Sequence, residues 1–179
     1  LGLFRLSDDY LSAVEYTELF KWQSREAPAI VREGDTYFMM FSACSGWDPN
    51  QASFSWSKSL TSGWSSRTNI GNSVAYDTQA ASILTIKGSE GTSYVYVGDR
   101  WQDPGLAESK TILFPISFKN NTITFNYVPR FDMNLPTGQC RTTGMTHLVS
   151  KEGWKVRACS SEETSSENGA SSNAIDGRT

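Results

Sequence analysis

The sequence is poor in the residues that most metal sites and nucleophilic active sites need. Its 179 residues include a single histidine, His147, and three cysteines, none of them in a Cys-x-x-Cys arrangement. This content argues against a zinc site, a Cys/His nucleophile pair and a Ser-His-Asp triad. Cys44, Cys140 and Cys159 permit one disulfide with one thiol left over, or a partner outside this sequence.

Long apolar runs and basic clusters are also missing. No apolar run approaches the roughly 18–20 residues that cross a bilayer, so we expect no membrane partner. The net charge is −3 and no Lys/Arg-rich run exists, which argues against nucleic acid as a partner. The chain starts without Met and without a signal-peptide layout, and we interpret it as an excerpt or a mature fragment.

Aromatic residues, in contrast, are abundant, at 12% of the chain. They favour strands, and exposed aromatic faces also stack on sugar rings. Helical periodicity is scarce, and only residues 11–19 suggest a turn or two of helix. Strand patterns recur between clusters of turn residues, at 28–33, 36–42, 52–57, 80–87, 93–99, 110–118 and 122–128.

This spacing of strands predicts an all-β fold of the sandwich, barrel or propeller type. Two strong hairpins, 28–42 and 80–99, each begin a unit of roughly 40–50 residues, the size of a four-stranded propeller blade. Residues 1–147 would then hold about three blades, too few to close a ring. Composition shifts near residue 148, and the polar stretch 160–169 has the character of a linker.

One carboxylate stands out by its position, Glu26 in the stretch Arg25-Glu26-Ala27-Pro28. The proline fixes its own φ and pushes Ala27 toward extended geometry, so we expect Glu26 on a stiff, extended entry to the first hairpin. A carboxylate held beside aromatics in this way can serve as a proton donor. An ordinary surface glutamate is the alternative. In a propeller, Glu26 and Gln79 would enter one site from neighbouring blades.

Five short motifs together resemble glycoside hydrolase family 43, and most closely its exo-β-1,3-galactanase (galactan 1,3-β-galactosidase) branch. They are Leu6-Ser7-Asp8-Asp9-Tyr10, Arg25-Glu26-Ala27-Pro28, Ser45-Gly46-Trp47-Asp48-Pro49-Asn50, Asp77-Thr78-Gln79 and Val97-Gly98-Asp99-Arg100-Trp101. The resemblance identifies residues 1–147 as the C-terminal part of a five-bladed β-propeller. Residues 148–179 look like a linker and the first strand region of a β-sandwich, a coagulation factor 5/8 type C (discoidin-like) domain. Ser160-Ser161-Glu162-Glu163 and Ala174-Ile175-Asp176-Gly177 carry that second match.

The resemblance implies an inverting glycosidase that releases galactose from the ends of β-1,3-linked galactan, such as arabinogalactan side chains. The general acid of the family lies in a Glu-Gly/Ala-Pro motif, which matches Glu26. In the galactanase branch a glutamine is thought to hold the attacking water, and Gln79 fits that place, with a polar strand cap as the alternative. The family's other two acidic residues belong to blades that precede this chain. We expect no required cofactor, although propeller channels and discoidin-like domains sometimes hold a structural calcium ion.

The remaining candidate residues would bind the sugar. Trp47 and Trp101 would stack on a galactose ring or belong to the core, and hydroxyl groups would be bound by Asp48, Asn50, Asp77, Asp99 and Arg100. A structural ion pair between Asp99 and Arg100 is the alternative for those two. The sequon Asn120-Asn121-Thr122 favours a secreted, extracellular protein, and we expect a monomer.

Two other functions remain open. One keeps the fold and changes the sugar, giving an arabinofuranosidase or xylosidase. The other is a carbohydrate-binding propeller without turnover. We expect residues 1–179 by themselves to be inactive and poorly stable, because an opened propeller exposes strand edges.

Overall fold

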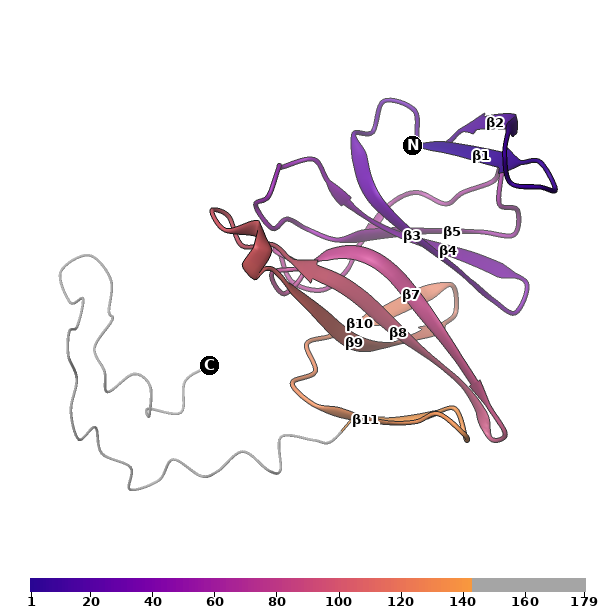
Figure 1. Ribbon diagram of the computed structural model, residues 1–179. Helices are drawn as coiled ribbons and strands as arrows, with labels where there is room; N and C mark the ends of the chain where they lie inside the picture. The colour runs from indigo at the N-terminus through magenta and orange to yellow at the C-terminus, as the bar shows by residue number, and fades with distance from the viewer. Residues whose placement is uncertain (143–179) are drawn as a thin grey trace, which may run out of the picture. The chain divides into compact units, whose positions relative to one another are not determined.

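The computed structural model describes residues 1–142 (Figure 1). Within this range the chain consists of β-strands and turns, with one short 3-10 turn at Leu106–Glu108. No helix in these residues is long and apolar enough to cross a membrane. His147, Cys159 and the expected discoidin-like region 148–179 lie outside the described residues.

The strands form four antiparallel sheets, and no sheet among residues 1–142 closes into a ring. Two sheets have four strands, in the orders β3-β4-β5-β6 and β10-β9-β8-β7, and the other two are the pairs β1-β2 and β11-β12. The bounds are β1 Gly2–Leu6, β2 Ala13–Glu18, β3 Arg25–Glu33, β4 Thr36–Ala43, β5 Ser53–Ser57, β6 Thr68–Asn69, β7 Gln79–Gly88, β8 Gly91–Arg100, β9 Lys110–Lys119, β10 Thr122–Phe125, β11 Phe131–Asn134 and β12 Gln139–Thr142.

The two hairpins predicted from the sequence are confirmed as β3–β4 and β7–β8. Each hairpin supplies the first two strands of a four-stranded sheet, and four is also the number of strands in a propeller blade. The all-β fold class is therefore confirmed, and residues 1–142 contain two four-stranded sheets and two two-stranded ones.

The suggestion of helix in residues 11–19 is wrong, because this segment contains strand β2. Val14, Tyr16 and Thr17 are β-branched or aromatic, and such side chains suit a pleated surface better than a helix. Strand β1 supplies the partner, and the rings of Phe4 and Tyr16 pack across the pair with centroids 4.9 Å apart. Cross-strand pairing outweighs the weak helical pattern here.

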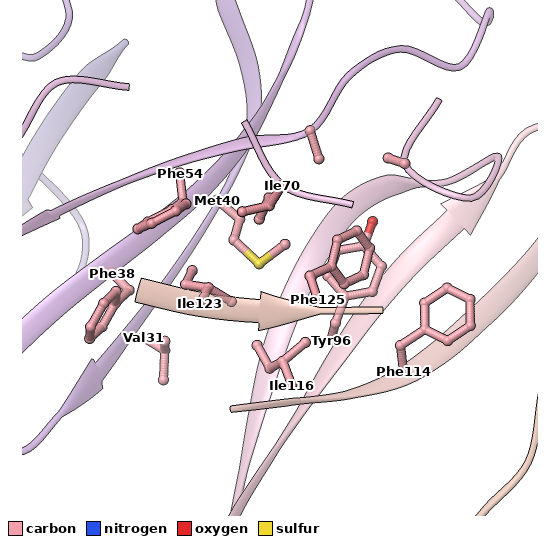
Figure 2. Packing of buried hydrophobic residues seen from close by; sticks show 12 residues of the cluster. Val31, Phe38, Met40, Phe54, Ile70, Tyr96, Phe114, Ile116, Ile123 and Phe125 are labelled. Atoms are coloured by element: carbon pink, nitrogen blue, oxygen red, sulfur yellow. The ribbon is translucent and has the colours of Figure 1, made fainter. Parts of the chain in front are cut away.

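The main core lies between the two four-stranded sheets (Figure 2). One sheet contributes Val31, Phe38, Met40 and Phe54, and the other contributes Tyr96, Phe114, Ile116, Ile123 and Phe125. Full burial of one such side chain stabilises the fold by about 1.5–3 kcal/mol. This packing holds the two sheets together, and β3 and β7 are neighbours across their boundary.

Strand β4 is enclosed on both faces. Phe38 and Met40 point into the main core, whereas Met39 and Phe41 pack with Leu19 in a second cluster. All four side chains of this run are at most 2% exposed. A strand buried on both faces carries a continuous apolar run, which is what residues 38–41 provide.

Candidate active site

Glu26 lies on a β-bulge at the start of β3. It pairs with Ser42 of β4, and the next pair joins Ala29 to Met40, so Ala27 and Pro28 together face one residue of the partner strand. The expectation of an extended Ala27 is wrong, since its φ is 51°. Pairing continues on both sides of Pro28, which has no N–H to donate, and the extra residue is accommodated in the bulge. Bulges of this kind change the direction in which neighbouring side chains point, and Glu26 directly precedes this one.

Gln79, the first residue of β7, meets Glu26 across the boundary between the two large sheets. Its Nε2 donates to Glu26 Oε1 at 2.9 Å and to Ser42 Oγ at 3.0 Å. Its Oε1 accepts a hydrogen bond from Trp101 Nε1 at 2.9 Å. The structure thus brings together two residues that are far apart in the sequence, as expected for neighbouring blades.

Arg100 hydrogen-bonds to backbone carbonyl oxygens in this structure. Its Nη2 donates to the carbonyl oxygen of Tyr76 at 2.9 Å, and its Nε donates to that of Asp77 at 3.4 Å. These carbonyls belong to a turn in which Ala75, Tyr76 and Asp77 all have positive φ, between 49° and 58°. Among the described residues no ion pair joins Asp99 to Arg100. Arg100 therefore holds the turn that leads into Gln79.

Trp47 and Trp101 form an aromatic pair beside these polar groups. Their ring centroids are 5.0 Å apart with an interplanar angle of 62°, an edge-on arrangement, and Trp47 is 47% exposed. An exposed aromatic face of this kind is suited to stacking on the C–H face of a sugar.

The predicted site residues surround two adjoining hollows. The first is a pocket of about 40 Å³ lined by Ser42, Gly46, Trp47, Asp48, Pro49, Asn50, Asp77, Thr78, Gln79, Asp99 and Trp101. The second is an open depression of about 290 Å³ lined by Glu26, Ala27, Gly46, Trp47 and Gln79. Arg100 is the one predicted site residue that lines neither hollow.

Asn50 anchors the loop that carries Trp47 and Asp48. Its Oδ1 accepts a hydrogen bond from the Ala43 N–H at 2.9 Å, and its Nδ2 donates to the Ala43 carbonyl at 3.0 Å. This pair of bonds closes residues 44–49 as backbone pairing would. A contact between Asn50 and a sugar hydroxyl stays a prediction, beside this structural role.

Two neighbours of the predicted residues were missed by sequence reasoning. Ser42 is 5% exposed and accepts one of the Gln79 hydrogen bonds. Thr78 is 4% exposed, donates to the Ala75 carbonyl at 2.6 Å and is 2.9 Å from the Tyr96 hydroxyl. Ser42 could have been found as the cross-strand partner of Glu26, but only if the bulge that sets the register had been known.

Cys44 lies next to Glu26 and is exposed. Partial desolvation, together with the Glu26 carboxylate as charge and hydrogen-bond partner, raises the pKa of the Cys44 thiol. The thiol therefore stays protonated at neutral pH. Within residues 1–142 no group of three or more His, Cys, Asp or Glu side chains could hold a metal ion.

Comparison with solved structures gives clear likenesses. The fold resembles an exo-β-1,3-galactanase from Clostridium thermocellum with a TM-score of 0.75 and 35% identity, over 78% of this chain and 32% of that one. It resembles a family 43 β-1,3-galactosidase with a TM-score of 0.66 and 30% identity, over 70% and 28% of the two chains. The fold also resembles an exo-β-1,3-galactanase from Phanerochaete chrysosporium, with a TM-score of 0.72 and 26% identity over 79% of this chain and 32% of that one. That protein was crystallised with β-1,3-galactotriose as a variant in which a glutamate is replaced by glutamine.

These structural neighbours are glycoside hydrolases of family 43, and the open all-β sheets described above match their propeller fold. This chain spans about a third of the length of each of these structures. No protein-family model matches the sequence, and a search of curated proteins finds no similar sequence.

Proposed function

We propose that this chain is part of a family 43 glycoside hydrolase that removes galactose from the ends of β-1,3-linked galactan with inversion. One observation carries the proposal: Glu26 lies on a bulge, hydrogen-bonded to Gln79, in a depression walled by Trp47. The likeness to exo-β-1,3-galactanases supports the choice of sugar. Because the chain spans about a third of those structures, the proposal concerns the protein at its full natural length.

Glu26 is the proposed general acid. An inverting glycosidase needs a proton donor at the leaving oxygen and a water on the opposite face of the sugar. Glu26 borders the open depression, where a sugar stacked on Trp47 would bring its glycosidic oxygen within reach. Asp48 and Asp99 line the adjoining pocket and are the proposed partners of hydroxyl groups.

Gln79 is the proposed holder of the attacking water. Trp101 occupies one lone pair of Oε1, and the second lone pair is free to accept a hydrogen bond from water. A neutral amide is a poor base, so its contribution is to orient the water, and positioning alone supplies a large part of many rate enhancements.

Entry of a sugar must separate Glu26 from Gln79. With Nε2 in contact with Glu26, amide geometry places Oε1 at most about 5 Å from the carboxylate, below the roughly 6.5–9.5 Å between the acid and the opposite group in inverting enzymes. We propose that the Glu26 side chain turns toward the leaving oxygen as the sugar binds. Ser42 and Trp101 continue to hold Gln79 in place.

Product analysis tests the proposal. The full-length protein is incubated with β-1,3-galactan and products are followed by NMR, beside Glu26→Gln and the matched control Glu33→Gln. Glu33 lies at the exposed far end of the same strand, outside both hollows. We expect α-galactose from the wild type and from Glu33→Gln, and none from Glu26→Gln, which still binds galactan.

Other outcomes assign the protein differently. Release of arabinose or xylose in place of galactose would keep the fold and change the substrate. Binding without release from galactan, arabinan or xylan would make the protein a carbohydrate-binding propeller. Secretion and a monomeric state stay part of the proposal, and the sequon supports the former, because Asn120 and Asn121 are exposed at the turn between β9 and β10.

A further inference from the structure

The side-chain amide of Gln79 is bonded at both ends, and the character of its partners defines its orientation. Nε2 faces two oxygens, Glu26 Oε1 and Ser42 Oγ, whereas Oε1 faces the indole N–H of Trp101. A flipped amide would place its NH₂ group against the indole N–H, where neither can accept a hydrogen bond.

The three partners differ in how strongly they favour one orientation of the Gln79 amide over the other. The Ser42 hydroxyl accepts or donates, so it suits either one. An ionised Glu26 accepts only, but a protonated Glu26 can donate its O–H to a carbonyl. The indole N–H of Trp101 donates only. Trp101 is therefore the one partner that holds the amide in the same orientation whether or not Glu26 carries its proton.

We propose that Trp101 is a positioning residue that acts through Gln79, an inference that rests on the function proposed above. Without the indole N–H, the Gln79 carbonyl would turn to protonated Glu26 and accept a hydrogen bond from its O–H, which would hold that proton away from the leaving oxygen. The same flip would replace the acceptor that holds the attacking water with an NH₂ group. Both effects slow the chemical step and leave binding of the sugar largely intact.

The surroundings of Trp101 suit this task. Its ring packs edge-on against Trp47, and its neighbour Arg100 donates hydrogen bonds to the carbonyls of Tyr76 and Asp77. The end of β8 is thus tied to the turn that precedes Gln79. This backbone framework sets the distance between Trp101 Nε1 and Gln79 Oε1.

The test compares Trp101→Phe with the matched control Trp47→Phe in the full-length protein. Both changes remove one indole N–H from the same aromatic pair, but among the described residues only Trp101 uses that N–H on Gln79. On β-1,3-galactan we expect Trp101→Phe to lower kcat roughly tenfold or more with little change in KM. Trp47→Phe should change mainly KM, through stacking.

A double-mutant cycle separates this role from a general loss of structure. In a Gln79→Met background there is no amide to orient, so adding Trp101→Phe should lower kcat no further. Equal kcat losses in Trp101→Phe and Trp47→Phe, or a full additional loss in the Gln79→Met background, would overturn the proposal. Thermal unfolding of every variant checks that the fold is retained.

A second readout does not depend on turnover. Both side-chain amide protons of Gln79 are hydrogen-bonded, so we expect slow exchange with solvent by NMR, accelerated in Trp101→Phe and unchanged in Trp47→Phe. The Gln79 signals are assigned by their loss in Gln79→Met. If the wild type releases no galactose, the proposed function fails, whereas unchanged exchange in Trp101→Phe would refute the role of Trp101 itself.

Discussion

Replacing Thr78 with valine should destabilise the protein more than replacing its partner Tyr96 with phenylalanine. The Thr78 hydroxyl has one proton, which it donates to the Ala75 carbonyl at 2.6 Å. The Tyr96 hydroxyl, 2.9 Å away, must therefore donate to Thr78 Oγ1. Tyr96 is completely buried and Thr78 is 4% exposed, so water does not replace a lost partner.

The magnitudes follow from what each change leaves unpaired. Thr78→Val keeps the side-chain shape and leaves both the Tyr96 O–H and the Ala75 carbonyl without a partner, at about 1–3 kcal/mol for each buried group. Tyr96→Phe removes one donor from the core, worth about 1 kcal/mol. Adding Tyr96→Phe to Thr78→Val removes the hydroxyl that has lost its partner, so the double variant should be more stable than Thr78→Val by about 1–3 kcal/mol.

The assay is urea unfolding of the full-length protein followed by tryptophan fluorescence. Free energies of unfolding are compared between variants whose m-values (the slopes against urea concentration) agree. The expected order of stability is wild type, Tyr96→Phe, double variant and Thr78→Val. An equal loss of stability in Tyr96→Phe and Thr78→Val, or a double variant that is the least stable of the four proteins, would contradict these hydrogen-bond assignments.

Three further predictions concern the core, a turn and the bulge. Burial raises the pKa of Tyr96 to about 12, against about 10 in an unfolded chain. The hydroxyl is neutral in both states well below pH 10, so it leaves stability unchanged there, and stability should fall by about 2–3 kcal/mol in total as pH rises from below 10 to above 12. Urea titrations should find this loss missing in Tyr96→Phe. A Cβ at Gly88 would clash with the backbone of Thr137 and Gly138, so Gly88→Ala should displace the β11–β12 hairpin. The backbone N–H groups of Ser89 and Glu90 donate to the carbonyls of Pro136 and Thr137, so they should then undergo rapid hydrogen exchange. Ala27→Gly should relieve the strain of a positive φ, worth about 1–2 kcal/mol, at an entropic cost of about 0.5–1 kcal/mol. The melting temperature should therefore rise slightly, and hydrolysis should persist. A clear drop in melting temperature would contradict the bulge geometry.

The sequence predicts the hairpins and much of the site because both depend on local patterns. β3–β4 and β7–β8 have strong strand residues around short turns, and Glu26 is the second residue of β3 while Gln79 is the first residue of β7. Once two such hairpins are assigned to adjacent sheets, their leading residues converge. The family resemblance then supplies the chemistry to test.

Other features depend on contacts that no short stretch of sequence contains. The left-handed Ala27 arises from pairing that continues past Pro28, and the residue pattern by itself favours the opposite geometry. The hydrogen bond from Trp101 to Gln79 needs the register of β7 on β8, in which Gln79 faces Asp99. Likewise Arg100 has backbone carbonyls as partners, and these have no sequence signature.

The enclosure of β4 has a consequence for altering specificity. Residues 38–41 tolerate little change because both of their faces are filled, and this rigid run ends at Ser42, beside Glu26. The loop that follows is exposed from Cys44 to Pro49 and is tied down again at Asn50. Under the function proposed above, exchanging residues 45–49 together while keeping β4 and Asn50 should change substrate preference and leave the fold intact.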